Sequence, residues 1–282
     1  MTKRPRVSRT KTQEDTEAES GFKPGDSVAL FVTCLVDLFR PSVGFAAAKL
    51  IEAVGCDIWM PKTQTCCGQP GYNSGDMTSA RRLARQTIAA FGGCDYVIVP
   101  SGSCASMLKI HYPRLFQDDP DMHDKAEKFA SRVHELVSFL YDVRGLRSID
   151  PAWHKDLNMP SRVTYHDSCS GLRELGVKAQ PRQLLTSIKG LQLVEMADSE
   201  ICCGFGGTFS LKFPDISNAM VEKKADNIEA ANADIIVAGD LGCLLNMAGK
   251  LARQGRNIHV RHVAEVLAGD FNTPPVGAAT SI

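Results

Sequence analysis

Short apolar runs alternate with longer amphipathic segments along most of the chain. Each apolar run has the length of a strand that is buried on both faces of a parallel sheet. The runs predict strands at 28–32, 56–60, 96–99, 163–165, 191–195 and 235–237, with a further edge strand at 257–262.

Between these runs, apolar residues recur at helical spacing. Met77, Ala80 and Ala84 share one helix face, and Gly92 follows as a stop signal. The same spacing predicts helices at 43–54, 107–111, 182–188 and 216–228, and one longer amphipathic helix at 126–140. Strands that alternate with helices indicate parallel βαβ units, and therefore an α/β fold.

A rare cysteine pattern occurs twice. Cys66-Cys67-Gly68 in the first half returns as Cys202-Cys203-Gly204 in the second. Gaps of 31 and 32 residues separate the pairs from a cysteine upstream, and gaps of 36 and 39 separate them from one downstream. The two sets are Cys34, Cys66, Cys67 and Cys104, and Cys169, Cys202, Cys203 and Cys243. We interpret this pattern as an internal repeat.

The repeat predicts two pseudo-symmetric domains, each a small parallel sheet flanked by helices. We place the first domain at 25–150 and the second at 161–268, because a polar stretch with two prolines separates them. Residues 1–24 are charged and poor in apolar side chains, so we expect a disordered tail. Residues 269–282 are expected to form a flexible C-terminal tail.

The charge balance narrows the class of protein. Lys plus Arg and Asp plus Glu both number 32, so nothing argues for binding to nucleic acid or a membrane surface. We find no run long enough to span a membrane, and no apolar segment follows the basic N-terminus as in a secretory signal. We therefore expect a cytoplasmic protein, whose ten cysteines serve metal or redox chemistry rather than disulfides.

Four of the repeated cysteines follow directly after predicted strands. They are Cys34, Cys104, Cys169 and Cys243. Because the carboxyl ends of parallel strands meet at one edge of a sheet, and the vicinal pairs lie in loops, four sulfurs can converge in each half. The remaining two, Cys56 and Cys94, flank strands and are interpreted as small buried apolar residues.

Three kinds of chemistry fit four thiols. Iron–sulfur clusters need several thiolates and glycines where the backbone approaches the cluster, and both vicinal pairs precede a glycine. Zinc also accepts four cysteines, although the usual C-x-x-C knuckles are missing. Thiol chemistry or a purely structural role is the third alternative. No G-x-G-x-x-G opens a helix, so no flavin or NAD signature is present.

The doubled arrangement of Cys, Cys-Cys-Gly and x-x-Cys resembles the cysteine-rich "CCG" domain family. This family includes the cysteine-rich component of heterodisulfide reductase, the iron–sulfur component of glycolate oxidase, and lactate-utilisation proteins, and the loops here are most similar to the last branch. The similar loops are Phe31-Val32-Thr33-Cys34-Leu35-Val36-Asp37, Ser101-Gly102-Ser103-Cys104, Tyr165-His166-Asp167-Ser168-Cys169 and Cys202-Cys203-Gly204-Phe205-Gly206-Gly207.

The chain departs from one member of that family at two positions. Where the heterodisulfide reductase component has C-x-x-C, this chain has Ser101-x-x-Cys104 and Asp240-x-x-Cys243. Four cysteines per site make one [4Fe–4S] cluster in each domain the simpler expectation. Ser101 and Asp240 are candidates for additional ligands or for hydrogen-bond partners of a cluster sulfide, or else for helix caps.

His166 is a candidate hydrogen-bond donor to a cluster sulfur or a proton relay, or else binds a local backbone group.

The resemblance implies an iron–sulfur electron-transfer subunit of a system that oxidises L-lactate to pyruvate, together with companion iron–sulfur or redox subunits. In that role the eight repeated cysteines bind two clusters. Two alternatives stay open: a heterodisulfide-reductase-like catalytic subunit that acts on thiols or disulfides, and a noncatalytic interaction module stabilised by zinc.

Overall fold

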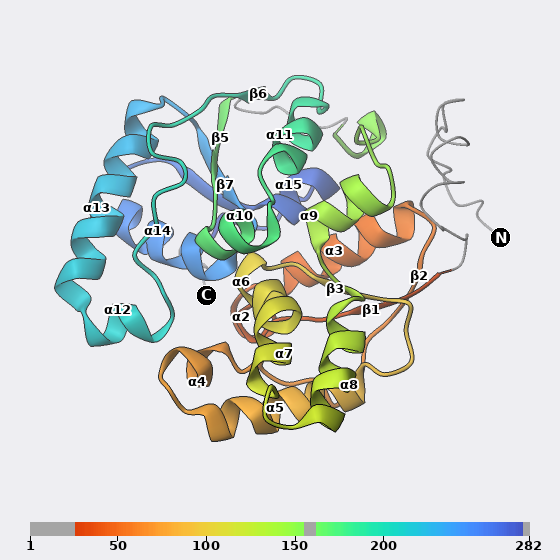
Figure 1. Cartoon of the computed structure of the whole chain (residues 1–282). Helices are drawn as coiled ribbons and strands as arrows, with labels where there is room; N and C mark the ends of the chain where they lie inside the picture. Colours follow the sequence, from red (N-terminus) through yellow and green to blue (C-terminus); the bar gives the residue numbers. More distant parts are fainter. Residues whose placement is uncertain (1–25, 155–161, 279–282) are drawn as a thin grey trace.

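Two four-stranded parallel sheets form the two halves of the chain (Figure 1). The computed structural model describes residues 26–154 and 162–278, so the tail expected at 1–24 lies outside the described residues. The strand orders are β2-β1-β3-β4 and β6-β5-β7-β8, which is the same order in both halves. This topology confirms the predicted pair of pseudo-symmetric α/β units.

The strands are short and mostly buried. The first sheet contains β1 (Ser27–Leu30), β2 (Asp57–Trp59), β3 (Tyr96–Val99) and β4 (Val133–Glu135). The second contains β5 (Arg162–His166), β6 (Gln192–Leu193), β7 (Ile235–Ala238) and β8 (His259–His262). In each half, the first and third strands form the centre and the second and fourth form the edges.

Helices connect the strands in both halves. In the first half they are α2 (Cys34–Phe39), α3 (Pro41–Ala53), α4 (Gln69–Asn73), α5 (Met77–Ala90), α6 (Gly102–Ser106), α7 (Tyr112–Leu115), α8 (Pro120–Ala130) and α9 (Leu136–Ser138). A π-helical turn at Met107–His111 joins α6 to α7, a second at Phe139–Val143 follows α9, and a 3₁₀ turn covers Pro151–His154. The second half contains α10 (Cys169–Leu175), α11 (Ala179–Thr186), α12 (Thr208–Lys212), α13 (Pro214–Ala230), α14 (Leu241–Arg253) and α15 (Val263–Ala268).

One predicted element is wrong. The helix expected at 126–140 ends at Ala130, and its middle forms β4, the fourth strand of the first sheet. The apolar spacing fits a helix, but Val133 and Glu135 are both buried in the strand, which pairs with β3. Tertiary pairing therefore overrides the local period here. The edge strand expected at 257–262 is confirmed as β8.

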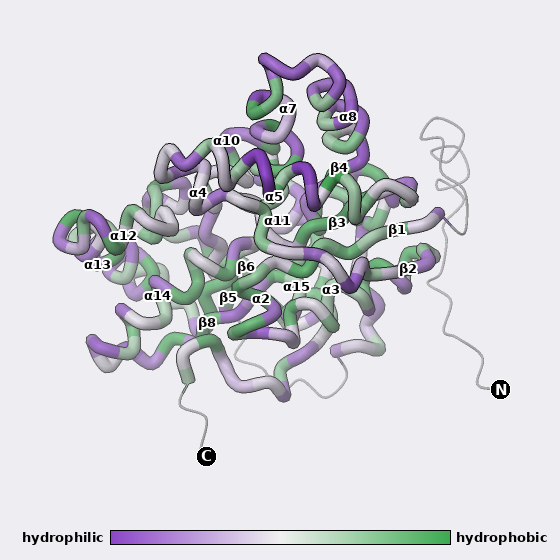
Figure 2. The backbone as a smooth tube through the Cα atoms, turned by 90° about the horizontal axis from the view of Figure 1, so that it is seen from below, coloured by the Kyte–Doolittle hydropathy of each residue, from purple (hydrophilic) through white to green (hydrophobic). Residues whose placement is uncertain are grey.

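The two halves share one apolar core. Side chains of α3, such as Leu50 and Ile51, belong to the same buried cluster as Leu267 of α15 in the second half. Figure 2 shows hydrophobic colours along the strands, whereas α8 and α13 carry long hydrophilic stretches. The buried residues of a second cluster, around Phe91 and Phe129, all come from the first half, and Leu175 of the second half packs against it.

The backbones of the two halves also come very close at α6 and α10. A Cβ atom added to Gly102 would lie 2.9 Å from the Cα of Gly171, a distance that real Cβ contacts do not reach. The Gly102 amide donates to the carbonyl of Gly239 in the second half, at 3.2 Å. Only glycine allows this approach, which sets α6 directly against α10.

A buried ion pair joins the halves at α3 and α15. Arg40 Nε lies 2.7 Å from Glu265 Oε1, and the Glu265 side chain is fully buried. Ser42 Oγ donates to the same oxygen at 2.6 Å, and Lys49 Nζ donates to the carbonyl of Ala268. The segment after α15 packs on this region, because Arg40 Nη1 donates to the carbonyl of Pro274.

We predict that Arg40→Met lowers the free energy of unfolding by about 3–5 kcal/mol, because it leaves the Glu265 carboxylate buried without its counter-ion. The matched control is Arg81→Met, which breaks an ion pair to Asp118 whose side chains are 41% and 65% exposed. We expect the control to cost less than about 1 kcal/mol. Denaturant titration measures both, and equal losses would contradict the prediction.

Candidate metal centres

The first set of cysteines meets at the carboxyl end of the first sheet. Cys34 is the first residue of α2, after β1, and Cys104 lies in α6, after β3. Cys66 and Cys67 come from the loop between β2 and α4. The sulfurs of Cys34 and Cys66 are 4.0 Å apart, and those of Cys67 and Cys104 are 3.4 Å apart. The predicted convergence of this set is what the structure contains.

The second set repeats this arrangement. Cys169 is the first residue of α10, after β5, and Cys243 lies in α14, after β7. The sulfurs of Cys203 and Cys243 and a ring nitrogen of His166 lie within 4.8 Å of one another. The Cys169 and Cys202 thiols lie close enough to shift each other's pKa, and Cys203 acts on Cys202 in the same way, so the remaining two thiols belong to the same group. All ten cysteines are free thiols, and Cys56 and Cys94 are buried away from both sets, as expected.

The glycine after each vicinal pair turns the loop back into its helix. Gly68 and Gly204 adopt φ values of 85° and 84°, in the left-handed region that favours glycine. A Cβ on Gly204 would also lie 2.7 Å from the carbonyl oxygen of Ser217, so the loop presses against α13. Side chains hold the second cysteine of each pair: Tyr112 Oη donates to the Cys67 carbonyl and Asn246 Nδ2 to that of Cys203, each at 2.9 Å.

Crowding of the thiols changes their acidity. The hydrogen bond with Cys66 and burial raise the pKa of Cys34, and the same hydrogen bond lowers the pKa of Cys66. Hydrogen bonds with Cys104 and Cys66, together with burial, raise the pKa of Cys67. The group therefore shares protons and resists full ionisation. A bound cation removes that resistance, because thiolates must lose their protons to ligate a metal.

Ser101 and Asp240 occupy equivalent places and contact each other. Ser101 caps α6 by accepting from the Cys104 amide at 3.3 Å, and Asp240 caps α14 by accepting from the Gly242 amide at 3.2 Å. The other Asp240 oxygen accepts from Ser101 Oγ at 3.2 Å and from the Ser103 amide at 2.9 Å. The predicted capping role is present, and one carboxylate also fixes both cysteine-bearing helices relative to each other.

His166 lies fully buried at the end of β5, beside the second set. Its Nδ1 is 3.2 Å from the carbonyl oxygen of Ser199, so it has a backbone partner, but one that lies 33 residues further along the chain rather than the local one expected. Burial, together with the nearby Lys224 ammonium, lowers the pKa of His166 to about 3. The ring is therefore neutral, and it presents one nitrogen lone pair rather than two donors.

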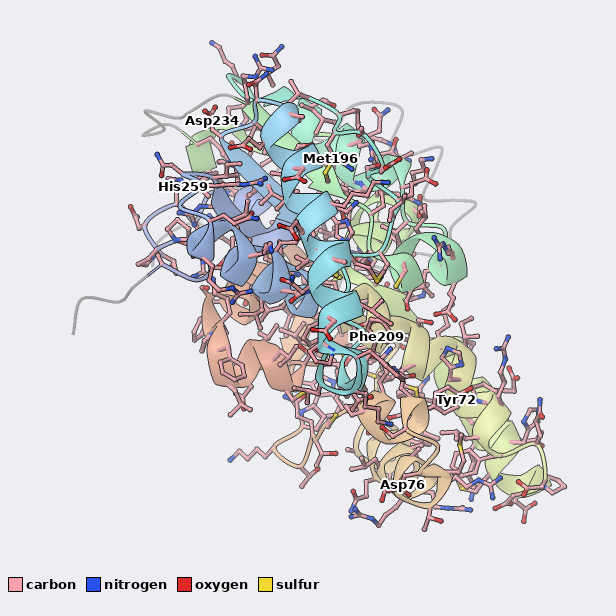
Figure 3. The ribbon with its side chains drawn as sticks, turned by 90° about the vertical axis from the view of Figure 1, so that its left-hand side faces the viewer. Tyr72, Asp76, Met196, Phe209, Asp234 and His259 are labelled. Atoms are coloured by element: carbon pink, nitrogen blue, oxygen red, sulfur yellow. The ribbon has the colours of Figure 1, made fainter. Side chains whose placement is uncertain are left out.

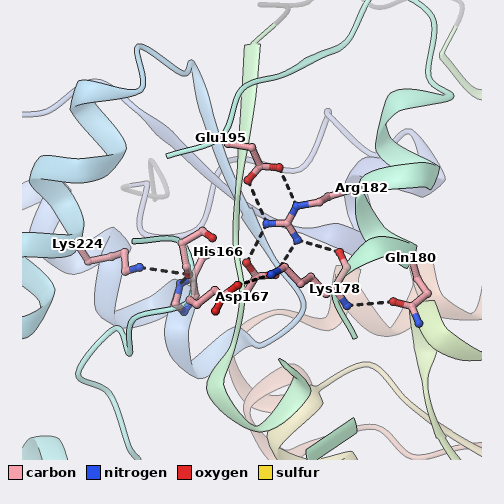
Figure 4. A network of polar contacts seen from close by, with 9 residues as sticks. His166, Asp167, Lys178, Gln180, Arg182, Glu195 and Lys224 are labelled. Carbon is pink, nitrogen blue, oxygen red and sulfur yellow. Dashed lines mark hydrogen bonds and ion pairs between the residues drawn. The ribbon is translucent and has the colours of Figure 1, made fainter. Parts of the chain in front are cut away.

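Lys224 is a functional-site residue that the sequence pattern does not single out. It is buried in α13, and its ammonium donates to the carbonyls of Asp198 and Ser199 in the loop before the second vicinal pair. Figure 4 shows it on one side of His166, with Arg182 on the other. Its neighbours Glu222 and Lys223 suggest a solvated charge run. The sequence signal that could identify Lys224 is its helical spacing from Val221 and Ile228, which are buried, because this spacing puts it on the buried face of the helix.

Arg182 completes the polar surroundings of the second set. Its guanidinium binds both oxygens of the buried Asp167 at 2.8 Å and also binds Glu195. The first half differs here, because Phe31 stands three residues before Cys34 where His166 stands before Cys169. The two sites therefore share sulfurs but differ in what surrounds them.

The loops that carry the vicinal pairs continue into α4 and α12, and these short helices meet. Ser74, next to α4, lies 3.4 Å from Thr208 of α12, between the two hydroxyl oxygens. Figure 3 shows Phe209 of α12 on the side that faces α4 and Tyr72. The loops of the two candidate centres are therefore in contact with each other.

The two sheet units and their duplicated cysteine sites identify the protein family to which the chain belongs. A family model for the cysteine-rich (CCG) domain matches residues 28–109 and 163–248, and the chain belongs to this family. The matched stretches are the two sheet units with their cysteines.

Relatives that match over almost their whole length show which branch of this family contains the chain. Lactate utilization protein A of Geobacillus kaustophilus is 48% identical over 240 residues, covering 85% of this chain and 98% of the relative. The protein of that name from Bacillus subtilis is 44% identical with the same coverage. The chain therefore belongs to the lactate utilization protein A family. A hypothetical protein from Helicobacter pylori shares the fold, with a TM-score of 0.61, 11% identity and coverage of 96% of this chain and 58% of that chain.

We predict that Asp240→Ala destabilises the protein by about 2–3 kcal/mol, because it removes a helix cap and leaves buried donors unpaired. It should also increase the rate at which Cys104 and Cys243 react with a thiol reagent. Asp76→Ala, which removes the exposed cap of α5 at Ser79, is the control and should leave both rates unchanged. Unchanged labelling in Asp240→Ala would contradict the role of this carboxylate.

The stability of the protein should depend on pH through Glu135, which caps α9 from the end of β4. Burial raises its pKa to about 7 from an ordinary value of 4.5. The stability linked to this group is therefore complete below about pH 4.5 and is lost as the pH rises through 7. Glu135→Gln should flatten this part of the stability profile and stabilise the protein at pH 8 by up to about 3 kcal/mol. The exposed Glu52→Gln serves as control, and matching profiles would contradict the assignment.

Proposed function

We propose that this protein is an iron–sulfur electron-transfer subunit of a system that oxidises L-lactate to pyruvate. The observation that carries the proposal is the pair of four-thiol groups at equivalent sheet ends. The name of its relatives supports the lactate part. Companion redox subunits would deliver or accept the electrons, and we place the system in the cytoplasm. Among the described residues, no helix is long and apolar enough to cross a membrane.

The donor set fits iron–sulfur clusters. In the first half Cys34, Cys66, Cys67 and Cys104 would hold one, and in the second half Cys169, Cys202, Cys203 and Cys243 would hold the other. A [4Fe–4S] cluster in each site would supply one-electron chemistry. The protein itself fixes the thiols through helix starts and glycine turns, and it buries Cys67, Cys203 and Cys243 while the other five thiols stay partly exposed. Ser101 and Asp240 cap helices and bond each other, so we assign ligation to the cysteines and not to these oxygens.

A mononuclear zinc site in each half is the second candidate. Tetrahedral zinc with Zn–S bonds of about 2.3 Å separates its sulfurs by about 3.8 Å. The sulfur distances of 3.4 and 4.0 Å in the first set bracket that value. In that case the protein would be an interaction module and not an electron carrier.

Anaerobic purification with iron, sulfide and zinc analysis distinguishes the two candidates. We expect about eight irons per chain with matching sulfide, and a visible band that bleaches with dithionite. Replacing Cys66 and Cys67 by Ser should remove half of the iron, and replacing Cys202 and Cys203 should do the same. Cys94→Ala, outside both sets, is the control and should retain all of it. Zinc without iron in the wild-type protein would refute electron transfer.

A further inference from the structure

One ring nitrogen of His166 has no partner in the described part of the chain. The side chain is fully buried, yet Nε2 makes no hydrogen bond there. A buried polar atom without a partner is costly, and native structures usually give it one. The groups that approach this ring from the neighbouring elements are Asp167 after β5, Lys224 of α13 and the sulfurs of Cys203 and Cys243.

The hydrogen bond at Nδ1 fixes which nitrogen carries the proton. Nδ1 lies 3.2 Å from the carbonyl oxygen of Ser199, and a carbonyl can only accept. Nδ1 must therefore donate, since the other tautomer would place two acceptors against each other. Nε2 then has a free lone pair and no proton to give to a sulfide. This arrangement removes the expected role of His166 as a hydrogen-bond donor to a cluster sulfur.

Neighbouring groups hold the His166 ring in the tautomer that carries its proton on Nδ1. Lys224 Nζ and the Asp167 amide both donate to the Ser199 carbonyl, at 3.3 and 3.2 Å, so that oxygen is fixed from several sides. Lys224 also donates to the Asp198 carbonyl, which directs its ammonium to the backbone. A histidine that donates one N–H to a carbonyl while its other nitrogen is free is arranged as metal-ligating histidines commonly are.

The geometry points to His166 Nε2 as a ligand of the second centre in place of one of the four thiolates assigned to it above, which makes that centre a mixed histidine–cysteine site. A ring nitrogen of His166 lies within 4.8 Å of the sulfurs of Cys203 and Cys243, close enough for a shared metal. The first centre is all-thiolate, because Phe31 occupies the matching position. This inference rests on the proposed function in that it requires a metal in the second site.

A neutral imidazole in place of a thiolate changes the redox order of the two centres. It removes a negative charge from the ligand set, and histidine ligation raises the potential of iron–sulfur centres. The buried cation of Lys224 acts in the same direction. The second centre is therefore reduced before the first.

Pulsed electron paramagnetic resonance on protein labelled with ¹⁵N-histidine tests the ligand directly. The wild-type chain, loaded anaerobically with iron and sulfide and then reduced with dithionite, should show the strong coupling of one directly bound nitrogen. His166→Phe, which copies the first half, should lose this coupling and lower the potential of the second centre. His134→Phe is the matched control: His134 contacts Tyr96 and Phe139, and its replacement should preserve the signal.

Full iron loading without nitrogen coupling in the wild-type protein would overturn the ligand assignment while leaving the proposed function intact. So would coupling that persists in His166→Phe. The wild-type measurement stands even if the variant fails to fold. A wild-type protein that binds zinc instead refutes electron transfer, and zinc X-ray absorption then decides the ligand by the presence or absence of nitrogen. A protein that binds no metal refutes both proposals.

Discussion

The central constraint on this structure is the close approach of four partly buried thiols at the end of each sheet. Thiols this close cannot all ionise without a cation, as the opposed pKa shifts of Cys34 and Cys66 illustrate. The chain therefore has to hold the sulfurs together by other means. Helix caps, left-handed glycines and side chains that bind the Cys67 and Cys203 carbonyls fulfil that task.

Much of this arrangement is predictable from sequence, because it depends on local signals. Apolar runs locate six of the eight strands, the edge strand at 257–262 adds a seventh, and the cysteine spacing places both sets at strand ends. The rest depends on contacts between distant segments. β4 carries a helical apolar period that pairing with β3 overrides, and the contact between Ser101 and Asp240 joins residues 139 positions apart. Lys224 lies in a charged stretch of α13, where helical spacing is its one sequence signal, and the contacts that make it part of the site appear only in the structure.

The internal duplication produces two similar cysteine sites, which can differ in function. The sheets and the sulfurs are repeated in both halves. Within the described ranges, however, only the second site has a buried histidine, a buried lysine and an arginine bound to a buried carboxylate next to its cysteines. Burial holds these groups in place: Asp167 is paired with Arg182, and Lys224 donates to backbone carbonyls. Differences between the two centres therefore arise from side chains next to the cysteines and not from the cysteines themselves.

The contact between Ser101 and Asp240 has a further consequence for the pseudo-symmetry itself. In a dimer of identical halves, the residue on a twofold axis faces its own copy. Two aspartates there would place two carboxylates about 3 Å apart and force them to share a proton, and two serines would offer no charge to hold the neighbouring amides. Joining the halves in one chain allows one serine to meet one aspartate. The single chain thus permits a polar junction that exact symmetry forbids.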